Sequence, residues 1–160
     1  MIFKKYLFIA ATLISTMSFA HEVVVKVSLS PAGSFEAKTS KVRGEIKKEG
    51  TKFIAESLSI KVDDLKTGID LRDEHFKKHL NYDKFPKIVM NKIVAENGKG
   101  TGELVVNDTT NKVEFTYKNV SDKKLEATFK VKASSFKLKE AKYLEIGVDD
   151  DVEIVATIDV

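Results

Sequence analysis

The segment LEATFKVKA, residues 125–133, places an apolar or small side chain at every second position. In an extended chain these side chains all point to one face, and the charged and hydroxyl side chains between them point to the other. A period of two predicts a β-strand with one buried face, because a helix would repeat every three or four residues. The regular alternation over this segment favours a protein built from strands.

Similar alternation recurs along the rest of the chain, with turn signals about every 8 to 12 residues, a spacing typical of a sandwich or barrel. The Asn97-Gly98 pair is the clearest hairpin signal. No segment is apolar on both faces over a long run, so a parallel sheet is disfavoured. We therefore predict an all-β, antiparallel barrel of about eight strands, since closure removes exposed sheet edges. Strands are expected near residues 23–29, 35–39, 42–46, 54–62, 87–94, 104–106, 113–117, 125–133 and 152–160.

One segment, TGIDLRDEHFKKHLNYDKFPKIV (residues 67–89), does not alternate. Its first half predicts a short helix at about residues 70–80 that packs against the strands through Leu71, Phe76 and Leu80. Acidic side chains come early in this helix and basic ones late, which complements the helix dipole. Two pairs of opposite charge are spaced i,i+4, as is favourable on a helix surface. The pairs are Asp73 with Lys77 and Glu74 with Lys78, and Asn81 follows as a C-terminal cap.

The first twenty residues have the features of a secretory signal peptide. Lys4 and Lys5 precede a mostly apolar run over residues 6–14. Ser18 and Ala20 place small side chains at the two positions that a signal peptidase recognises. The apolar run is shorter than the ~20 residues of a membrane-spanning helix. We predict cleavage after Ala20, a single domain over residues 21–160, and a periplasmic or secreted location.

Charge and cysteine content exclude several classes of function. The chain has 27 Lys and Arg residues against 24 Asp and Glu residues, and two of the lysines belong to the predicted signal peptide. The mature chain is therefore close to neutral and has no basic block typical of a nucleic-acid interface. It has no cysteine, so neither a disulfide nor a cysteine nucleophile exists.

Few residues are arranged for catalysis. His75 and His79 are four apart on the predicted helix and could bind zinc together with a third ligand. However, Phe76 occupies the position where an H-E-x-x-H metalloprotease has its glutamate. No G-x-S-x-G motif or phosphate-binding glycine loop is present, and the runs Asp63-Asp64 and Asp149–Asp151 resemble polar strand ends. We predict no catalytic residue, no metal and no cofactor, and hence a protein that is not an enzyme.

The inward face of the barrel leaves two possibilities open. A barrel of about eight strands is either filled by its own side chains or holds one small ligand. Apolar alternation serves both arrangements equally well. The inward candidates from the pattern alone include Leu58, Ile60, Leu104, Phe115, Phe129 and Ile158.

The non-alternating segment supplies a more specific signal. LKTGIDLRDEHFKKHLNYDKFPKIVM contains Thr67-Gly68, then Arg72-Asp73-Glu74-His75, then Phe85-Pro86 before a strand. This order resembles the signature of the YceI family of exported, lipocalin-like proteins. LSPAGSF with KVRG near the start, GTGELVVN in the middle and VDDDVEIVATIDV at the end extend the resemblance over nearly the whole mature chain. One departure is Gly33, which stands where many members have a histidine.

The resemblance implies a lipocalin-like barrel of eight antiparallel strands with the helix against it, enclosing an elongated apolar cavity. In this family the cavity holds an isoprenoid lipid of the quinone or polyprenyl type, for transport, storage or protection from stress. The alternative is a barrel with a filled core that acts as a structural or protein-interaction module. Both transient contact with a membrane and dimer formation stay open. We predict an apolar ligand-binding lining of Leu58, Ile60, Phe76, Phe85, Met90, Leu104, Phe115, Phe129 and Ile158, and a helix fixed by an Arg72–Asp73 salt bridge.

Overall fold

The computed structural model describes residues 21–143 and 146–160, and the predicted signal peptide lies outside this range. Nine strands follow one another across a single antiparallel sheet in the order β2-β1-β10-β8-β7-β6-β5-β4-β3, and the short strand β9 pairs with β10. The strands are β1 (Glu22–Ser30), β2 (Ser34–Thr39), β3 (Lys47–Glu49), β4 (Lys52–Lys61), β5 (Lys87–Glu96), β6 (Lys99–Val106), β7 (Thr109–Ser121), β8 (Lys124–Lys132), β9 (Lys142–Tyr143) and β10 (Ile146–Asp159).

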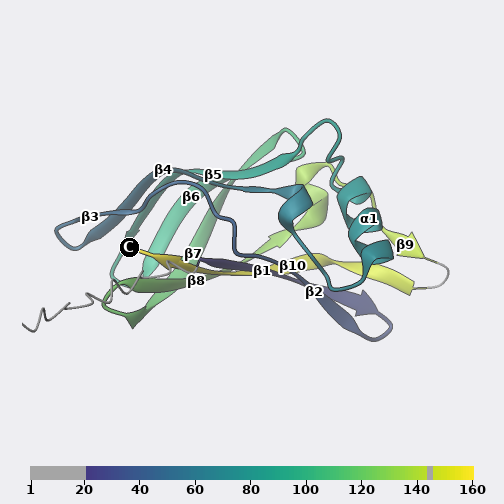
Figure 1. The fold of residues 1–160 in the computed structure, drawn as a ribbon, viewed down its shortest axis with the longest axis horizontal. Helices are drawn as coiled ribbons and strands as arrows, with labels where there is room; N and C mark the ends of the chain where they lie inside the picture. The colour runs from purple at the N-terminus through teal and green to yellow at the C-terminus, as the bar shows by residue number, and fades with distance from the viewer. Residues whose placement is uncertain (1–20, 144–145) are drawn as a thin grey trace, which may run out of the picture.

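The sheet curls into a half-barrel with two walls, one formed around β4 to β6 and the other around β1, β2 and β10 (Figure 1). The helix α1 (Asp70–His79) lies at one end of the barrel, beside β9, and the chain ends near the opposite end. The all-β, antiparallel prediction is confirmed. The structure has more strands than the eight expected, because β3 and β9 are too short to show an alternation.

The two edges of the sheet approach each other along a seam between residues 38–43 and residues 59–66. Lys38 and Lys66 exchange two backbone hydrogen bonds of 2.8 and 2.9 Å, and Arg43 and Ser59 exchange two of 2.9 and 2.8 Å. These two isolated bridges replace a continuous ladder at this edge. The edges of the half-barrel are therefore joined at the seam by four backbone hydrogen bonds in two pairs.

The predicted strand at 42–46 is wrong, because this segment runs along the seam as a loop. Gly44 has φ +116°, which side-chain-bearing residues rarely adopt, and a Cβ at this position would overlap the carbonyl oxygen of Ser57. The glycine thus turns the chain and lets it lie directly against β4. The apolar residues that suggested a strand, Val42 and Ile46, are both half-buried in that loop.

The turn signals in the sequence predicted the structure more accurately than the expected strand ends did. Asn97 and Gly98 both have positive φ (53° and 80°), as a two-residue hairpin turn of this type requires. The chain leaves β8 at Lys132 and forms the 3-10 helix η2 (Ala133–Phe136), so the predicted strand is one residue too long. Asp149–Asp151 lie inside β10 with exposed side chains and do not end a strand.

The predicted helix is confirmed within one residue, although its side chains make different contacts from those expected. Neither i,i+4 ion pair forms: buried Asp73 bonds to Thr67, outside the helix, and buried Lys77 pairs with Asp63, outside the helix, and with Glu74 at spacing i,i+3. Leu80 is buried, but Leu71 is 67% exposed and is not part of a packed stripe. Asn81 follows in the left-handed region (φ 53°) and donates its N–H to Lys78, as a C-terminal cap residue does.

The end of the barrel next to β3 is filled. Phe115 packs its buried ring into the space where a side chain on Gly100 would lie, and Phe53 meets Tyr117 edge to face with ring centroids 5.7 Å apart. Lys48 lies over the Phe53 ring at 5.7 Å from its centroid. Aromatic side chains therefore occupy the interior at this end.

Candidate functional site

An apolar cavity of about 970 Å³ occupies the other part of the barrel, between the two walls and α1. Its volume lies near the upper end of the range for pockets that bind small molecules. All but seven of its lining residues are apolar, and the seven are Ser59, Arg72, His75, Lys78, His79, Glu140 and Lys142. The cavity therefore suits a ligand that is mostly hydrocarbon.

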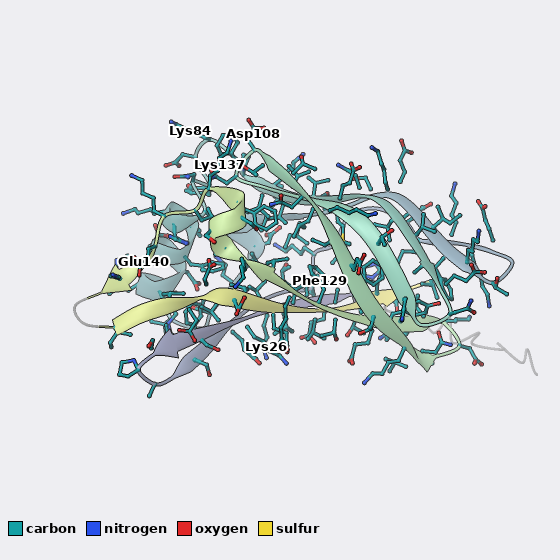
Figure 2. All side chains as sticks on the ribbon, turned by 180° about the vertical axis from the view of Figure 1, so that it is seen from behind. Lys26, Lys84, Asp108, Phe129, Lys137 and Glu140 are labelled. Atoms are coloured by element: carbon teal, nitrogen blue, oxygen red, sulfur yellow. The ribbon has the colours of Figure 1, made fainter. Side chains whose placement is uncertain are left out.

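Seven of the nine predicted lining residues face this cavity. They come from strands on both walls and from the helix: Leu58, Ile60, Phe76, Met90, Leu104, Phe129 and Ile158. Figure 2 shows Phe129 between the two walls of the curled sheet, with Lys26 outside them. Leu58, Ile60, Leu104, Phe129 and Ile158 lie on the inward face that the alternation indicated.

The remaining two predicted lining residues lie elsewhere. Phe115 is buried at the filled end of the barrel and does not line the cavity. Phe85 is half-buried in the connection between α1 and β5, where its N–H bonds to the carbonyl of Asn81 at 2.9 Å. Whether any of the nine residues contacts a ligand stays a prediction.

Nine of the lining residues that the sequence did not single out lie on β1 and β10, in the wall formed around β1, β2 and β10. Val25, Val27 and Leu29 of β1 line the cavity, as do Ile154 and Ala156 of β10. Their period of two was visible in the sequence and could have identified them. Phe136 and Leu138 also line it, but they come from η2 and the loop after it, where no periodicity marks an inward position.

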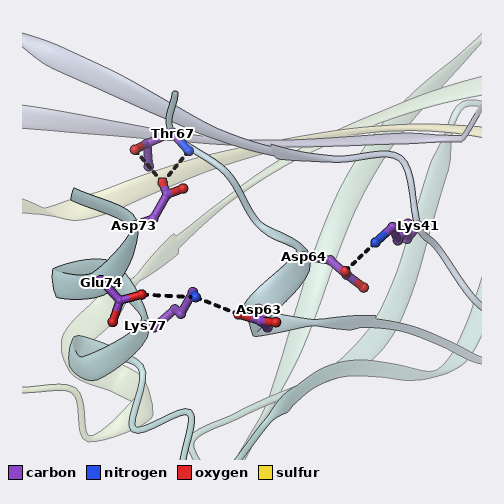
Figure 3. A network of polar contacts seen from close by, with 7 residues as sticks. All are labelled: Lys41, Asp63, Asp64, Thr67, Asp73, Glu74 and Lys77. Carbon is purple, nitrogen blue, oxygen red and sulfur yellow. Dashed lines mark hydrogen bonds and ion pairs between the residues drawn. The ribbon is translucent and has the colours of Figure 1, made fainter. Parts of the chain in front are cut away.

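A network of polar contacts sets the position of α1 (Figure 3). The Asp73 carboxylate accepts hydrogen bonds from the backbone N–H of Thr67 (2.7 Å) and from its hydroxyl (2.6 Å). Burial would raise the pKa of Asp73, but these hydrogen bonds, with Lys66 and Lys77 nearby, outweigh it and lower the pKa. The predicted Arg72–Asp73 salt bridge is wrong: Asp73 is occupied by Thr67.

Lys77 makes the second connection of the helix. Its ammonium lies 2.6 Å from Asp63 of the 3-10 helix η1 (Val62–Asp64) and 3.4 Å from Glu74. Hydrogen bonding to Asp63 raises the pKa of Lys77 and lowers that of Asp63. Asp64, next in η1, bonds to Lys41 on the other side of the seam at 2.8 Å. These contacts join the helix to the seam and leave its opposite side facing the cavity.

Six of the seven polar side chains that line the cavity gather near α1 and β9. Arg72, His75, Lys78 and His79 come from the helix, and Glu140 and Lys142 come from the segment that faces it. Burial lowers the pKa of His79, because it disfavours the charged imidazolium form. Ile69, Leu71 and Ile146 also line this end and are 49%, 67% and 44% exposed, which places the mouth of the cavity here.

Arg72 has an unusual environment at the mouth. It is half-buried, and its guanidinium lies over the Phe35 ring, 5.0 Å from the ring centroid. Phe35 in turn meets Phe76 edge to face with ring centroids 6.1 Å apart. The contact with the Phe35 ring therefore positions the guanidinium at the mouth of the cavity.

The histidine pair does not assemble a metal site within residues 21–143 and 146–160. Across these residues no three His, Cys, Asp or Glu side chains are grouped as metal ligands. Within the same ranges, no helix has the length and apolar character needed to cross a bilayer.

Comparison with known families supports the fold. The family model for the YceI-like domain matches residues 14–160. No curated protein sequence matches the chain significantly.

Several solved structures are similar across most of the chain. BcnA from Burkholderia cenocepacia is 16% identical with a TM-score of 0.68, covering 88% of this chain and 96% of that one. A YCEI protein from Campylobacter jejuni is 17% identical with a TM-score of 0.63, covering 99% and 98%. A polyisoprenoid binding domain from Saccharophagus degradans, implicated in plant cell wall breakdown, is 10% identical with a TM-score of 0.60, covering 86% and 91%. At these identities the likeness concerns the fold.

Proposed function

Because the chain belongs to the YceI-like family, we propose that it is a non-enzymatic binding protein that holds an isoprenoid lipid, of the quinone or polyprenyl type, in its cavity. The observation that carries this proposal is the cavity of about 970 Å³ with its almost entirely apolar lining. Isoprenoid chains exposed to water cost ~25 cal/mol per Å² of apolar surface, and a lining of this kind removes that surface from water. The name of the Saccharophagus degradans relative supports the choice of ligand class.

The proposal is tested by native mass spectrometry of protein purified from its own cells, with organic extraction in parallel. We expect a reproducible mass increment that is released as a prenylated species. An apo mass in every preparation, together with no uptake of added quinone or polyprenol, would contradict it.

A pair of variants links the bound lipid to the cavity. Ala156→Phe places a ring among the lining residues of β10, whereas Ser28→Phe adds the same ring to the exposed face of β1. We expect the first variant to lose the lipid increment and the second to keep it. Equal lipid content in both variants would place the ligand outside the cavity.

We further propose that the protein is exported and works in the periplasm or outside the cell, taking its lipid from a membrane by transient contact. The charge and apolar pattern of residues 1–20 supports this proposal. N-terminal sequencing of the cell-derived protein should begin at His21. An intact Met1 would contradict export by this route.

A further inference from the structure

Among the described residues, the side chains at the mouth of the cavity carry more positive than negative charge. Glu140 is the only acidic lining residue within the described ranges, and the ammonium of Lys142 lies 3.1 Å from it. This pair is neutral as a whole. Arg72 and Lys78 remain, and neither has a carboxylate within 4.0 Å among the residues that the structure describes.

Among the residues that the structure describes, Arg72 also has no hydrogen-bond acceptor. A guanidinium has five N–H donors in a planar fork, and this one is half-buried against Phe35. Within residues 21–143 and 146–160 it donates to no protein oxygen, although nearby Asp73 accepts from Thr67. A carboxylate or phosphate would match the fork through two parallel hydrogen bonds.

We propose that the mouth selects an anionic head group, so that the ligand is a single-chain amphiphile with a carboxylate or phosphate held by Arg72, assisted by Lys78. The hydrocarbon chain then lies between the walls, and the head stays at the end where polar lining residues gather. This inference rests on the proposed lipid-binding function and defines the chemistry of its ligand.

The arrangement of the mouth supports entry of the chain before the head. Leu71 and Ile146 are exposed beside the basic side chains, so a hydrocarbon chain meets apolar surface at the entrance. Placing the head inside instead would bring an anion against side chains such as Leu104 and Phe129, where no donor compensates its lost hydration.

Displacement of the neutral dye N-phenyl-1-naphthylamine measures the preference directly. The competitors are farnesyl phosphate and palmitate, each paired with its neutral alcohol, farnesol or hexadecanol. We expect each anion to bind about tenfold more tightly than its alcohol, with a preference that weakens as salt is added. The larger of the two anion-to-alcohol affinity ratios identifies the preferred head as phosphate or carboxylate, because each ratio compares two ligands with the same length of hydrocarbon chain.

Variants of Arg72 test whether this residue causes the preference for an anionic head group. In Arg72→Gln the affinity for the anions should fall about tenfold, whereas the affinity for the alcohols should change little. Arg72→Lys keeps the charge but not the planar fork of donors. Its affinity for the anions should therefore lie between those of wild type and Arg72→Gln. Arg43→Gln is the matched control, because Arg43 is exposed at the seam and does not line the cavity.

The outcomes separate this inference from the proposed function. Equal affinities of wild-type protein for farnesyl phosphate and farnesol, or an equal loss of both in Arg72→Gln, would overturn the head-group preference and leave lipid binding intact. Failure of the dye and of all four competitors to bind would overturn both proposals.

Discussion

Asp73 and Lys77 are charged side chains on the buried side of α1, where apolar residues would be expected. Each is compensated by a specific partner: Asp73 by the N–H and hydroxyl of Thr67, and Lys77 by Asp63 and Glu74. Buried charges without such partners would destabilise the fold. The helix is thus held in one position by directional contacts, which a purely apolar stripe would not impose.

Removing the Asp73 carboxylate should destabilise the protein. In Asp73→Ala the N–H and hydroxyl of Thr67 lose their acceptor, and we expect the free energy of unfolding to fall by about 2 kcal/mol. Asp70→Ala, at an exposed position in the first turn of the same helix, should change it much less. Urea unfolding monitored by circular dichroism measures both. Equal losses would show that Asp73 acts only through the helix dipole.

The same carboxylate predicts a pH dependence. Because folding lowers the pKa of Asp73 below its ordinary value of 3.8, its stabilising effect is complete above that pH. The effect is lost as the pH falls from there through the lower pKa of the folded state. The difference in unfolding free energy between wild type and Asp73→Asn should therefore be constant from pH 7 to about pH 5 and shrink toward pH 3. A difference that grows on acidification would contradict the assigned shift.

At the scale of the element, the loop along the seam depends on one glycine. Gly44 combines φ +116° with a position against the Ser57 carbonyl, so Gly44→Ala introduces both backbone strain and a steric overlap. We expect a loss of at least about 3 kcal/mol in unfolding free energy. Gly50→Ala is the control: its φ is +63° and no atom lies within 4 Å of the added Cβ. That variant should lose only about 1 kcal/mol. Comparable losses in chemical denaturation would show that the close approach at Gly44 contributes nothing.

The helix illustrates which features a sequence can predict. Its bounds followed from its charge order and from Asn81, because caps and dipoles are local properties of the chain. Its contacts did not, because Asp63 and Thr67 reach Lys77 and Asp73 only once the chain has folded around η1. Arg72 was misassigned for the same reason, since the Phe35 ring that it covers lies on a distant strand.

On the scale of the whole molecule, the barrel is filled at one end and hollow at the other. Phe115 and Phe129 show the same inward periodicity, yet one fills the end near β3 and the other lines the cavity. Alternation identifies the inward face of a strand but not the position along the barrel at which opposing side chains meet. That position depends on the register of the strands and the placement of α1, which no local pattern encodes.

A lipid in the cavity should stabilise the folded state. A ligand that binds only this state, at 100 times its dissociation constant, adds about 2.7 kcal/mol to the free energy of unfolding. For a domain of this size that corresponds to a rise in melting temperature of roughly 5 to 10 °C. We expect delipidated wild-type protein to show this rise with added lipid in differential scanning calorimetry, and Ala156→Phe to show none. A similar rise in the variant would place the stabilising site elsewhere.

The seam is the line along which the barrel can widen most easily. A fully laddered barrel can widen only by breaking a whole row of backbone hydrogen bonds, whereas this one needs to separate the Lys38–Lys66 and Arg43–Ser59 bridges and the Lys41–Asp64 ion pair. The amide protons of these four residues should therefore exchange with deuterium sooner than those between β8 and β10, which pair over nine consecutive positions. Equal protection in hydrogen-exchange mass spectrometry would contradict this. A circumference that yields at one line while the rest of the sheet stays intact would let one and the same fold accommodate ligands of different bulk.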